Sequence, residues 1–189
     1  MTSSLSMLRR NPTAALLAAA GLFAAIGAFN IAAHPATEHD LHSYKEYVLT
    51  ATLIPAVFVV LWVLSALHGL HETRLGGVGL RIAAVALMAL LVDGVVTLAS
   101  ATTDTAGPLY PIGMFATWIG IVLLAIGWHR ARTLPRWIGP ALAAGWFVAA
   151  TPLRPSFLIL SAVLLAVAVA LRPASTGVLV AAEDTGIAA

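Results

Sequence analysis

Hydrophobic positions fall in six continuous runs, and the polar residues lie in short segments between them. The runs cover residues 13–33, 48–67, 81–100, 108–128, 137–151 and 156–171. A membrane-spanning helix needs about 20 consecutive apolar residues, a length that the first four runs supply. The runs are continuous rather than alternating, which argues against a transmembrane barrel. The pattern therefore predicts an all-α, polytopic helical membrane protein with six transmembrane helices.

The last two runs are short for a membrane span. At 1.5 Å per residue they give helices of about 22–24 Å, so they either cross a locally thinned bilayer or form a re-entrant hairpin. Both alternatives stay open. Residues 1–12 are expected to form a cytoplasmic segment, residues 13–172 a single transmembrane bundle, and residues 173–189 a disordered cytoplasmic tail, because the tail consists mostly of small residues.

Basic residues are distributed unequally between the two sides that six spans would define. Two of them, Lys45 and Arg154, lie on one side. The other side holds Arg9, Arg10, Arg74, Arg81, Arg130, Arg132, Arg136 and Arg172. Lys and Arg are enriched in cytoplasmic loops. We therefore expect a plasma-membrane protein with both termini in the cytoplasm.

Composition narrows the possibilities further. Charged residues make up 10% of the chain, against about 25% in a typical soluble domain. The basic residues lie between apolar spans and form no nucleic-acid-binding patch. The absence of cysteine excludes disulfides and thiolate chemistry. The expected partners are the lipid bilayer and a membrane protein partner or a second copy of the chain, and the abundance of Ala, Val, Leu and Gly suggests a bacterial source.

Asp93 is the one charged residue far inside an apolar run. A charge at bilayer depth costs about 2.5–3.5 kcal/mol on insertion scales, so it usually faces other helices, water or a ligand. Thr97 and Ser100 follow it at i+4 and i+7 and share its helix face. Two interpretations remain: a binding group in a polar notch, or a structural acid bonded to a neighbouring helix.

Polar side chains gather in the half of each span that the charge bias places outside. This half contains Asn30, Thr50, Thr52, Asp93, Thr97, Ser100, Thr117, Thr151, Ser156 and Ser161, with Arg154 just beyond it. A pore across the membrane would need polar lining on the inner side as well. The sequence therefore predicts an outward-facing polar cavity with Asp93, Thr97, Ser100 and Arg154 as candidate binding residues.

The loop between the first two spans is rich in histidine and acid. Its possible metal ligands are His34, Glu38, His39, Asp40, His42 and Glu46. Imidazole and carboxylate suit zinc, but no complete metal-site spacing is present, so a solvated helix beginning near Glu38 is the favoured interpretation. The segment His68–Glu72 has the order H-x-x-H-E, which matches no zinc-peptidase motif. No metal and no cofactor are expected.

Three functional hypotheses follow. The first is a non-enzymatic membrane component, such as an accessory subunit, an assembly factor or a sensor. The second is a small ion- or proton-coupled transporter in which Asp93 titrates. The third is a membrane-embedded enzyme, although the chain contains no G-x-S-x-G, P-loop or dinucleotide-binding fingerprint.

Overall fold

The computed structural model describes residues 11–33, 41, 43–70, 72–102, 107–132, 134–151, 153 and 155–172. This part of the chain is helical apart from short connections. The helices are α2 (Pro12–Ala33), α3 (Tyr44–Leu70), α4 (Arg74–Ser100), α5 (Leu109–Ala131), α6 (Ile138–Ala149) and α7 (Ser156–Leu171). The predicted all-helical architecture is confirmed.

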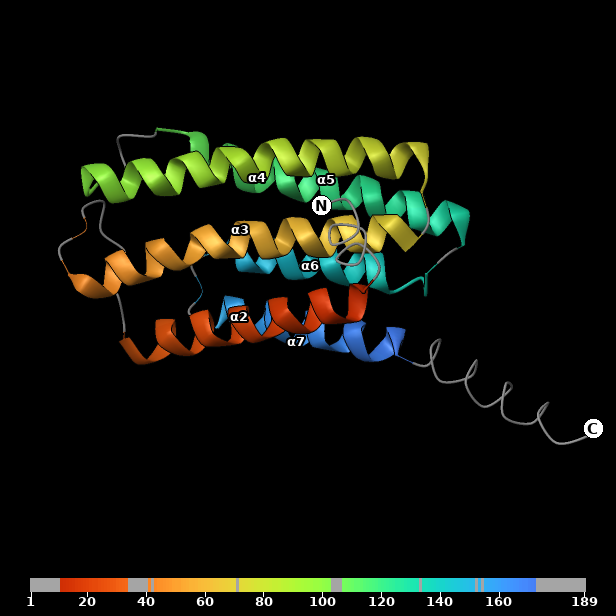
Figure 1. The fold of residues 1–189 in the computed structure, drawn as a ribbon, viewed down its shortest axis with the longest axis horizontal. Coiled ribbons are helices and arrows are strands. Elements are labelled where there is room, and N and C mark those ends of the chain that lie inside the picture. The colour runs from red at the N-terminus through yellow and green to blue at the C-terminus, as the bar shows by residue number, and fades with distance from the viewer. Residues whose placement is uncertain are drawn as a thin grey trace, which may run out of the picture.

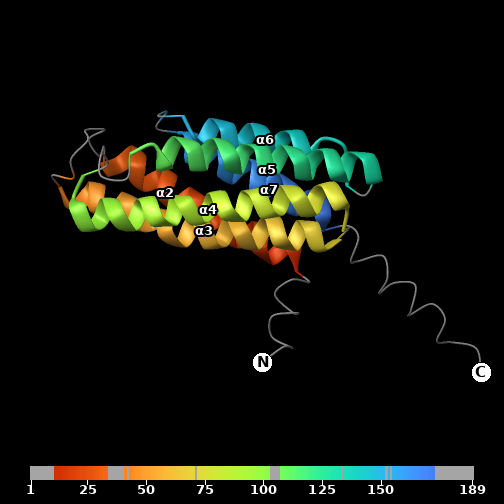
Figure 2. The ribbon, with the colours of Figure 1, turned by 90° about the horizontal axis from the view of Figure 1, so that it is seen from above.

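The helices form a closed ring in which each one packs against its neighbours in the chain. The pairs α2–α3, α3–α4, α4–α5, α5–α6 and α6–α7 are in contact, and α7 closes the ring against α2. In Figure 1, α2, α3 and α4 lie side by side in front, with α7, α6 and α5 behind them. The view from above shows the same two groups of three helices (Figure 2).

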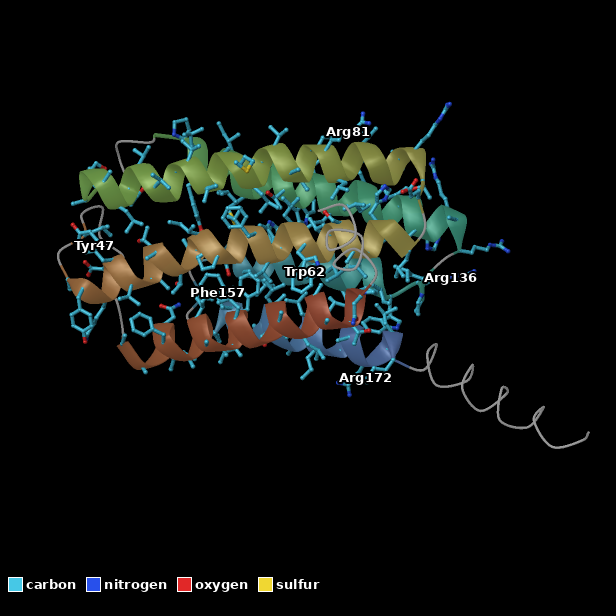
Figure 3. All side chains as sticks on the ribbon, in the orientation of Figure 1. Tyr47, Trp62, Arg81, Arg136, Phe157 and Arg172 are labelled. Atoms are coloured by element: carbon cyan, nitrogen blue, oxygen red, sulfur yellow. The ribbon has the colours of Figure 1, made fainter. Side chains whose placement is uncertain are left out.

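The two ends of the bundle differ in charge. At one end α2, α4 and α6 begin and α3, α5 and α7 finish (Figure 1). Arg74, Arg130, Arg132, Arg136 and Arg172 lie at this basic end, two of them labelled in Figure 3. Among the described residues, Lys45 in the first turn of α3 is the one Lys or Arg at the opposite, distal end. The sequence bias in basic residues is therefore a bias between two ends of one bundle.

The outer surface of the bundle is apolar along its length. Phe58, Val85, Phe115 and Phe147, from four different helices, are each more than half exposed. Four helices, α2 to α5, are long and apolar enough to cross a membrane, whereas α6 and α7 have 12 and 16 residues. Water would solvate such a surface poorly, so the bundle has the character of a membrane protein.

Helices α4 and α5 approach each other most closely near the basic end. A Cβ atom added to Gly79 would lie 2.6 Å from the Gly120 carbonyl oxygen, and one added to Gly120 would lie 2.7 Å from that of Gly79. Gly113 and Gly127 also face α4, so every seventh residue of α5 presents bare backbone to its neighbour. Small residues allow such close approach between membrane helices, which associate through packing rather than through hydrophobic burial.

Two predicted helix boundaries are wrong. The apolar runs end at residue 67 and begin again at residue 81, but α3 continues to Leu70 and α4 begins at Arg74, capped by Thr73, whose side chain accepts a hydrogen bond from the Gly76 amide. Gly76 does not mark a turn: it lies in the first turn of α4, where a Cβ would meet Thr73 and His68. Likewise α3 begins at Tyr44 rather than near Glu38, and Leu41 and Ser43 are not helical.

Candidate functional site: a cavity inside the helix ring

The ring encloses a cavity of about 570 Å³ in its distal half. All six helices contribute to its wall. The lining residues are Phe23, Leu41, Glu46, Leu49, Thr50, Leu53, Ala56, Val57, Val60, Leu90, Asp93, Gly94, Thr97, Gly107, Tyr110, Pro111, Met114, Trp146, Ala149, Phe157 and Leu160. Leu41 and Gly107 belong to the connections before α3 and α5, so the cavity extends to the distal end of the bundle.

The cavity is elongated and has an apolar floor. Along α3 its wall runs from Glu46 to Val60, which corresponds to about 21 Å of helix axis. Phe23, Val60, Trp146 and Leu160 separate it from a second space of only about 20 Å³, whose lining is apolar throughout. Toward the basic end the ring is therefore filled by side chains.

The packing between α4 and α5 explains why the cavity lies where it does. On α4 the positions that face the bundle continue from Gly76, Gly79 and Ala83 to Asp93 and Thr97, which line the cavity. On α5, Tyr110 lies three residues before Gly113 and therefore on the same face of the helix. Two heptads along α4 from Gly79 and Ala83 come Asp93 and Thr97, so larger side chains take the place of these two small residues in the distal half.

Asp93 lies partway along the cavity and is 9% exposed. A Cβ on Gly94, the neighbour of Asp93 in α4, would lie 4.0 Å from Ile54 of α3. Asp93 is therefore level with Ile54, which lies about 12 Å farther along the axis of α3 than Glu46. Among the described residues its carboxylate accepts no hydrogen bond and forms no ion pair. The Tyr110 hydroxyl is close enough to interact with it electrostatically.

Glu46 is the second buried acid of the cavity, at 7% exposure. Its Oε2 accepts a hydrogen bond of 2.8 Å from the Ser43 amide, which is the contact that the acid makes in a capping box, at the start of α3. Glu46 therefore stabilises the helix terminus beside the mouth of the cavity. Nearby, the Leu41 amide donates to the Ala101 carbonyl oxygen at 2.8 Å and joins this connection to the end of α4.

Aromatic rings line much of the deeper wall. Phe23 of α2 and Phe157 of α7 stack with their centroids 6.1 Å apart. The Trp146 indole N–H donates to the Met114 carbonyl oxygen at 3.2 Å, which fixes the ring at the floor. In the projection of Figure 3, Phe157 appears between α2 and α3, nearer the distal end than Trp62. The wall thus combines apolar and aromatic surface with a few oxygen atoms.

The four predicted binding residues do not all lie in the cavity wall. Asp93 and Thr97 both line the cavity. Ser100 is exposed and outside the lining, and its hydroxyl lies 2.8 Å from the Val96 carbonyl oxygen and 3.0 Å from that of Thr102, the two acceptors for its one proton. Arg154 lies outside the described residues. The role of these residues in binding stays a prediction.

Most of the other polar side chains in the distal half satisfy the backbone rather than the cavity. Thr52 and Thr117 each donate to a carbonyl oxygen of their own helix, and Thr151 donates from just beyond the end of α6 to the Val148 carbonyl oxygen. Ser161 donates to the Ala20 carbonyl oxygen and joins α7 to α2 at 2.7 Å. The cavity is consequently more apolar than the distribution of polar residues indicated.

The candidate metal ligands fall mainly outside the described residues; of the six, only Glu46 is described. Across the described ranges, no group of three or more His, Cys, Asp or Glu side chains could hold a metal ion. His68 lies near the end of α3 at the basic end of the bundle, far from the cavity lining. Its Nδ1 atom is buried and has no hydrogen-bond partner among the described residues.

Sequence reasoning missed Glu46 and Tyr110 as cavity residues. Ser43-x-x-Glu46 is a capping box, and this pattern would have placed Glu46 on the first turn of α3. The series Gly113, Gly120 and Gly127 would have identified the face of α5 that meets α4, with Tyr110 three residues before it. Phe23 and Trp146 carry no signal of this kind, because their position depends on how the ring closes.

The chain matches no protein-family model, no curated protein and no solved structure.

Proposed function

We propose that the chain is a plasma-membrane protein that crosses the bilayer six times, with residues 13–172 as one bundle and both termini in the cytoplasm. The basic end would face the cytoplasm, because Lys and Arg are enriched there, and the distal end would face outward. Helices α6 and α7 would then cross a locally thinned bilayer, because they pack in the ring beside α5 and α2.

Within that topology we propose a non-enzymatic ligand-binding component, such as a sensor or an accessory subunit. The observation that carries this proposal is the cavity of about 570 Å³ inside the ring, which reaches the distal end and has an apolar floor. Its volume lies within the range of about 300–1,000 Å³ typical of small-molecule sites. The filled basic half does not favour a channel, because a pore needs a continuous polar path.

Thiol labelling of intact cells tests the topology. The chain has no cysteine, so background labelling is absent. Tyr44, which is 71% exposed, lies at the distal end, and the exposed Arg136 lies at the basic end. A membrane-impermeant maleimide should label Tyr44→Cys from outside and Arg136→Cys only after permeabilisation. The reverse result would overturn the orientation and place the cavity on the cytoplasmic side.

A carrier that uses Asp93 is the second candidate. The observation that favours it is the buried carboxylate in a cavity that extends to one end, since intramembrane acids often serve ion or proton coupling. Proteoliposomes with a fluorescent pH indicator inside distinguish the two functions. A binding component should leave an imposed proton gradient unchanged, with or without a candidate ligand. A ligand-dependent flux that is lost in Asp93→Asn would establish the carrier.

A further inference from the structure

Among the described residues, no cation inside the ring compensates the charge of Asp93. Among the described residues, no Lys or Arg lines the cavity, and all but Lys45 and Arg81 lie at the basic end. Arg81 lies on the outer, exposed face of α4 (Figure 3). A buried carboxylate is costly unless a positive charge or hydrogen-bond donors accompany it. A ligand that carries a positive charge would supply the missing partner.

The walls around Asp93 favour an organic cation over a metal ion. Hard metal ions require several oxygen ligands, whereas Asp93 and Thr97 are surrounded mostly by carbon. Tyr110, Trp146 and the stacked Phe23–Phe157 pair instead provide aromatic surface. Aromatic faces attract ammonium groups, and the attraction is stronger where water is excluded.

The shape of the cavity indicates where each part of a ligand would lie. Asp93 lies level with Ile54 of α3. From that level the cavity continues toward the basic end for about 9 Å of helix axis, as far as Val60. This lower part is bounded by Phe23, Trp146 and Leu160 and has no carboxylate. Glu46 provides a second negative charge near the mouth, where it would attract cations toward the cavity.

We propose that the cavity binds an amphipathic organic cation, with its ammonium group at Asp93 and its apolar, aromatic body in the lower part of the cavity. This assignment rests on the proposed ligand-binding function and adds the chemical class of the ligand. Asp93 supplies the charge, Tyr110 and Trp146 supply aromatic surface, and Thr97 supplies a hydroxyl beside the carboxylate.

Equilibrium dialysis with three probes of one shape tests the proposal. The probes are 4-phenylbutyl-trimethylammonium, its uncharged isostere with carbon in place of nitrogen, and 4-phenylbutanesulfonate. The purified full chain in lipid nanodiscs should bind the cation at least about tenfold more tightly than the neutral isostere, because a pairing with a buried charge is worth more than an apolar contact. The anion should bind weakest of the three.

Substitutions locate the binding group. Asp93→Asn, which keeps the shape of the side chain, should remove the preference for the cation and leave the affinity for the neutral isostere unchanged. Asp93→Glu should retain the preference. The matched control is Glu72→Gln, because Glu72 is an exposed acid at the basic end; this variant should bind all three probes as the parent chain does. A thermal unfolding curve for each variant verifies folding.

The possible failures are distinguishable. Equal binding of the cation and the neutral isostere, with no effect of Asp93→Asn, would overturn the ligand class and leave the ligand-binding function standing. A preference for the sulfonate would also overturn it and would indicate a net positive cavity. Binding of none of the probes by folded protein would overturn both the ligand class and the proposed ligand-binding function.

Discussion

The basic half of the bundle is filled by side chains, whereas the distal half of the same six helices encloses a cavity. Most of the largest fully buried side chains belong to the filled region: Leu16, Leu67, Leu87, Leu124, Trp128, Ile138 and Val167. In this half α4 and α5 touch through Gly79 and Gly120. In the distal half, the corresponding faces carry Asp93, Thr97 and Tyr110.

The difference shows how a membrane protein can build a cavity without irregular backbone. Lipid is as apolar as a leucine side chain, so membrane helices gain little from hydrophobic burial against one another and depend on close packing. Gly79 and Gly120 allow that packing near the basic end, whereas two heptads along α4 from Gly79 the chain carries Asp93, which lines the cavity. The described helices remain continuous while the space between them changes.

Glycine substitutions should give the largest difference between the two halves. Gly79→Ala places a methyl group against the backbone of α5, and overpacking of this kind costs about 1–3 kcal/mol of stability. Gly94→Ala adds the same methyl group in the cavity, where the nearest atom is 4.0 Å away, and should be tolerated. Thermal unfolding in detergent measures both.

Gly21→Ala is the matched control for this pair, because nothing lies within 4 Å of a Cβ at Gly21. It should unfold at nearly the parent temperature. A similar loss of stability in Gly79→Ala and Gly94→Ala would mean that the two halves are packed equally well.

Removal of polar groups should have a smaller effect. Ser161→Ala removes the hydrogen bond from α7 to the Ala20 carbonyl oxygen and should cost about 0.6–1.7 kcal/mol. Asp93→Leu removes a carboxylate that has no partner among the described residues, so stability should be retained or increased. Reversible denaturation measures the free energy of unfolding of both variants. A severe loss of stability in Asp93→Leu would identify Asp93 as a packing contact between helices.

The cap of α3 should give the smallest effect. Glu46→Ala removes the carboxylate that accepts the Ser43 amide and should cost about 0.3–1 kcal/mol. Glu46→Gln keeps an oxygen acceptor and should lie between the parent and Glu46→Ala. Hydrogen exchange of the amides in the first turn of α3 reports the change locally. Unaltered exchange in Glu46→Ala would show that the cap does not stabilise this end of the helix.

The sequence predicted much of the architecture and little of the cavity wall. Runs of apolar residues located all six helices, because a membrane requires continuous apolar length. They located the start of α4 poorly, since Gly76 and Gly77 resemble a turn unless the close packing on α5 is known. Asp93 and Thr97 were found from helical periodicity along one element. Phe23, Trp146 and Phe157 were not, because their common position depends on contacts between helices far apart in the chain.

The sequence also predicted more polar residues in the cavity than the structure places there, for a related reason. A hydroxyl in an apolar helix can bond to the carbonyl oxygen of its own preceding turn, as Thr117 does with Gly113. Periodicity shows on which face a serine or threonine lies, but it does not reveal this local alternative. A carboxylate has no proton to donate when ionised, which is why Asp93 remained informative where Ser100 did not.

Thiol reactivity along α4 tests the central claim, a cavity that is reached from the distal side and carries the charge of Asp93. Thr97→Cys lies in the cavity wall and Ala86→Cys lies deeper along the same helix, outside that wall. Two small impermeant methanethiosulfonates, one cationic and one anionic, would be applied to intact cells, with folding verified separately.

We expect both reagents to modify Thr97→Cys, the cationic one faster, and neither to modify Ala86→Cys. In the double variant that also carries Asp93→Asn, the cationic advantage should disappear. Equal reactivity of Thr97→Cys and Ala86→Cys would contradict the conclusion that side chains fill the basic half of the ring. An unreactive Thr97→Cys in folded protein would contradict the account as a whole, because the cavity would then be closed to the distal side.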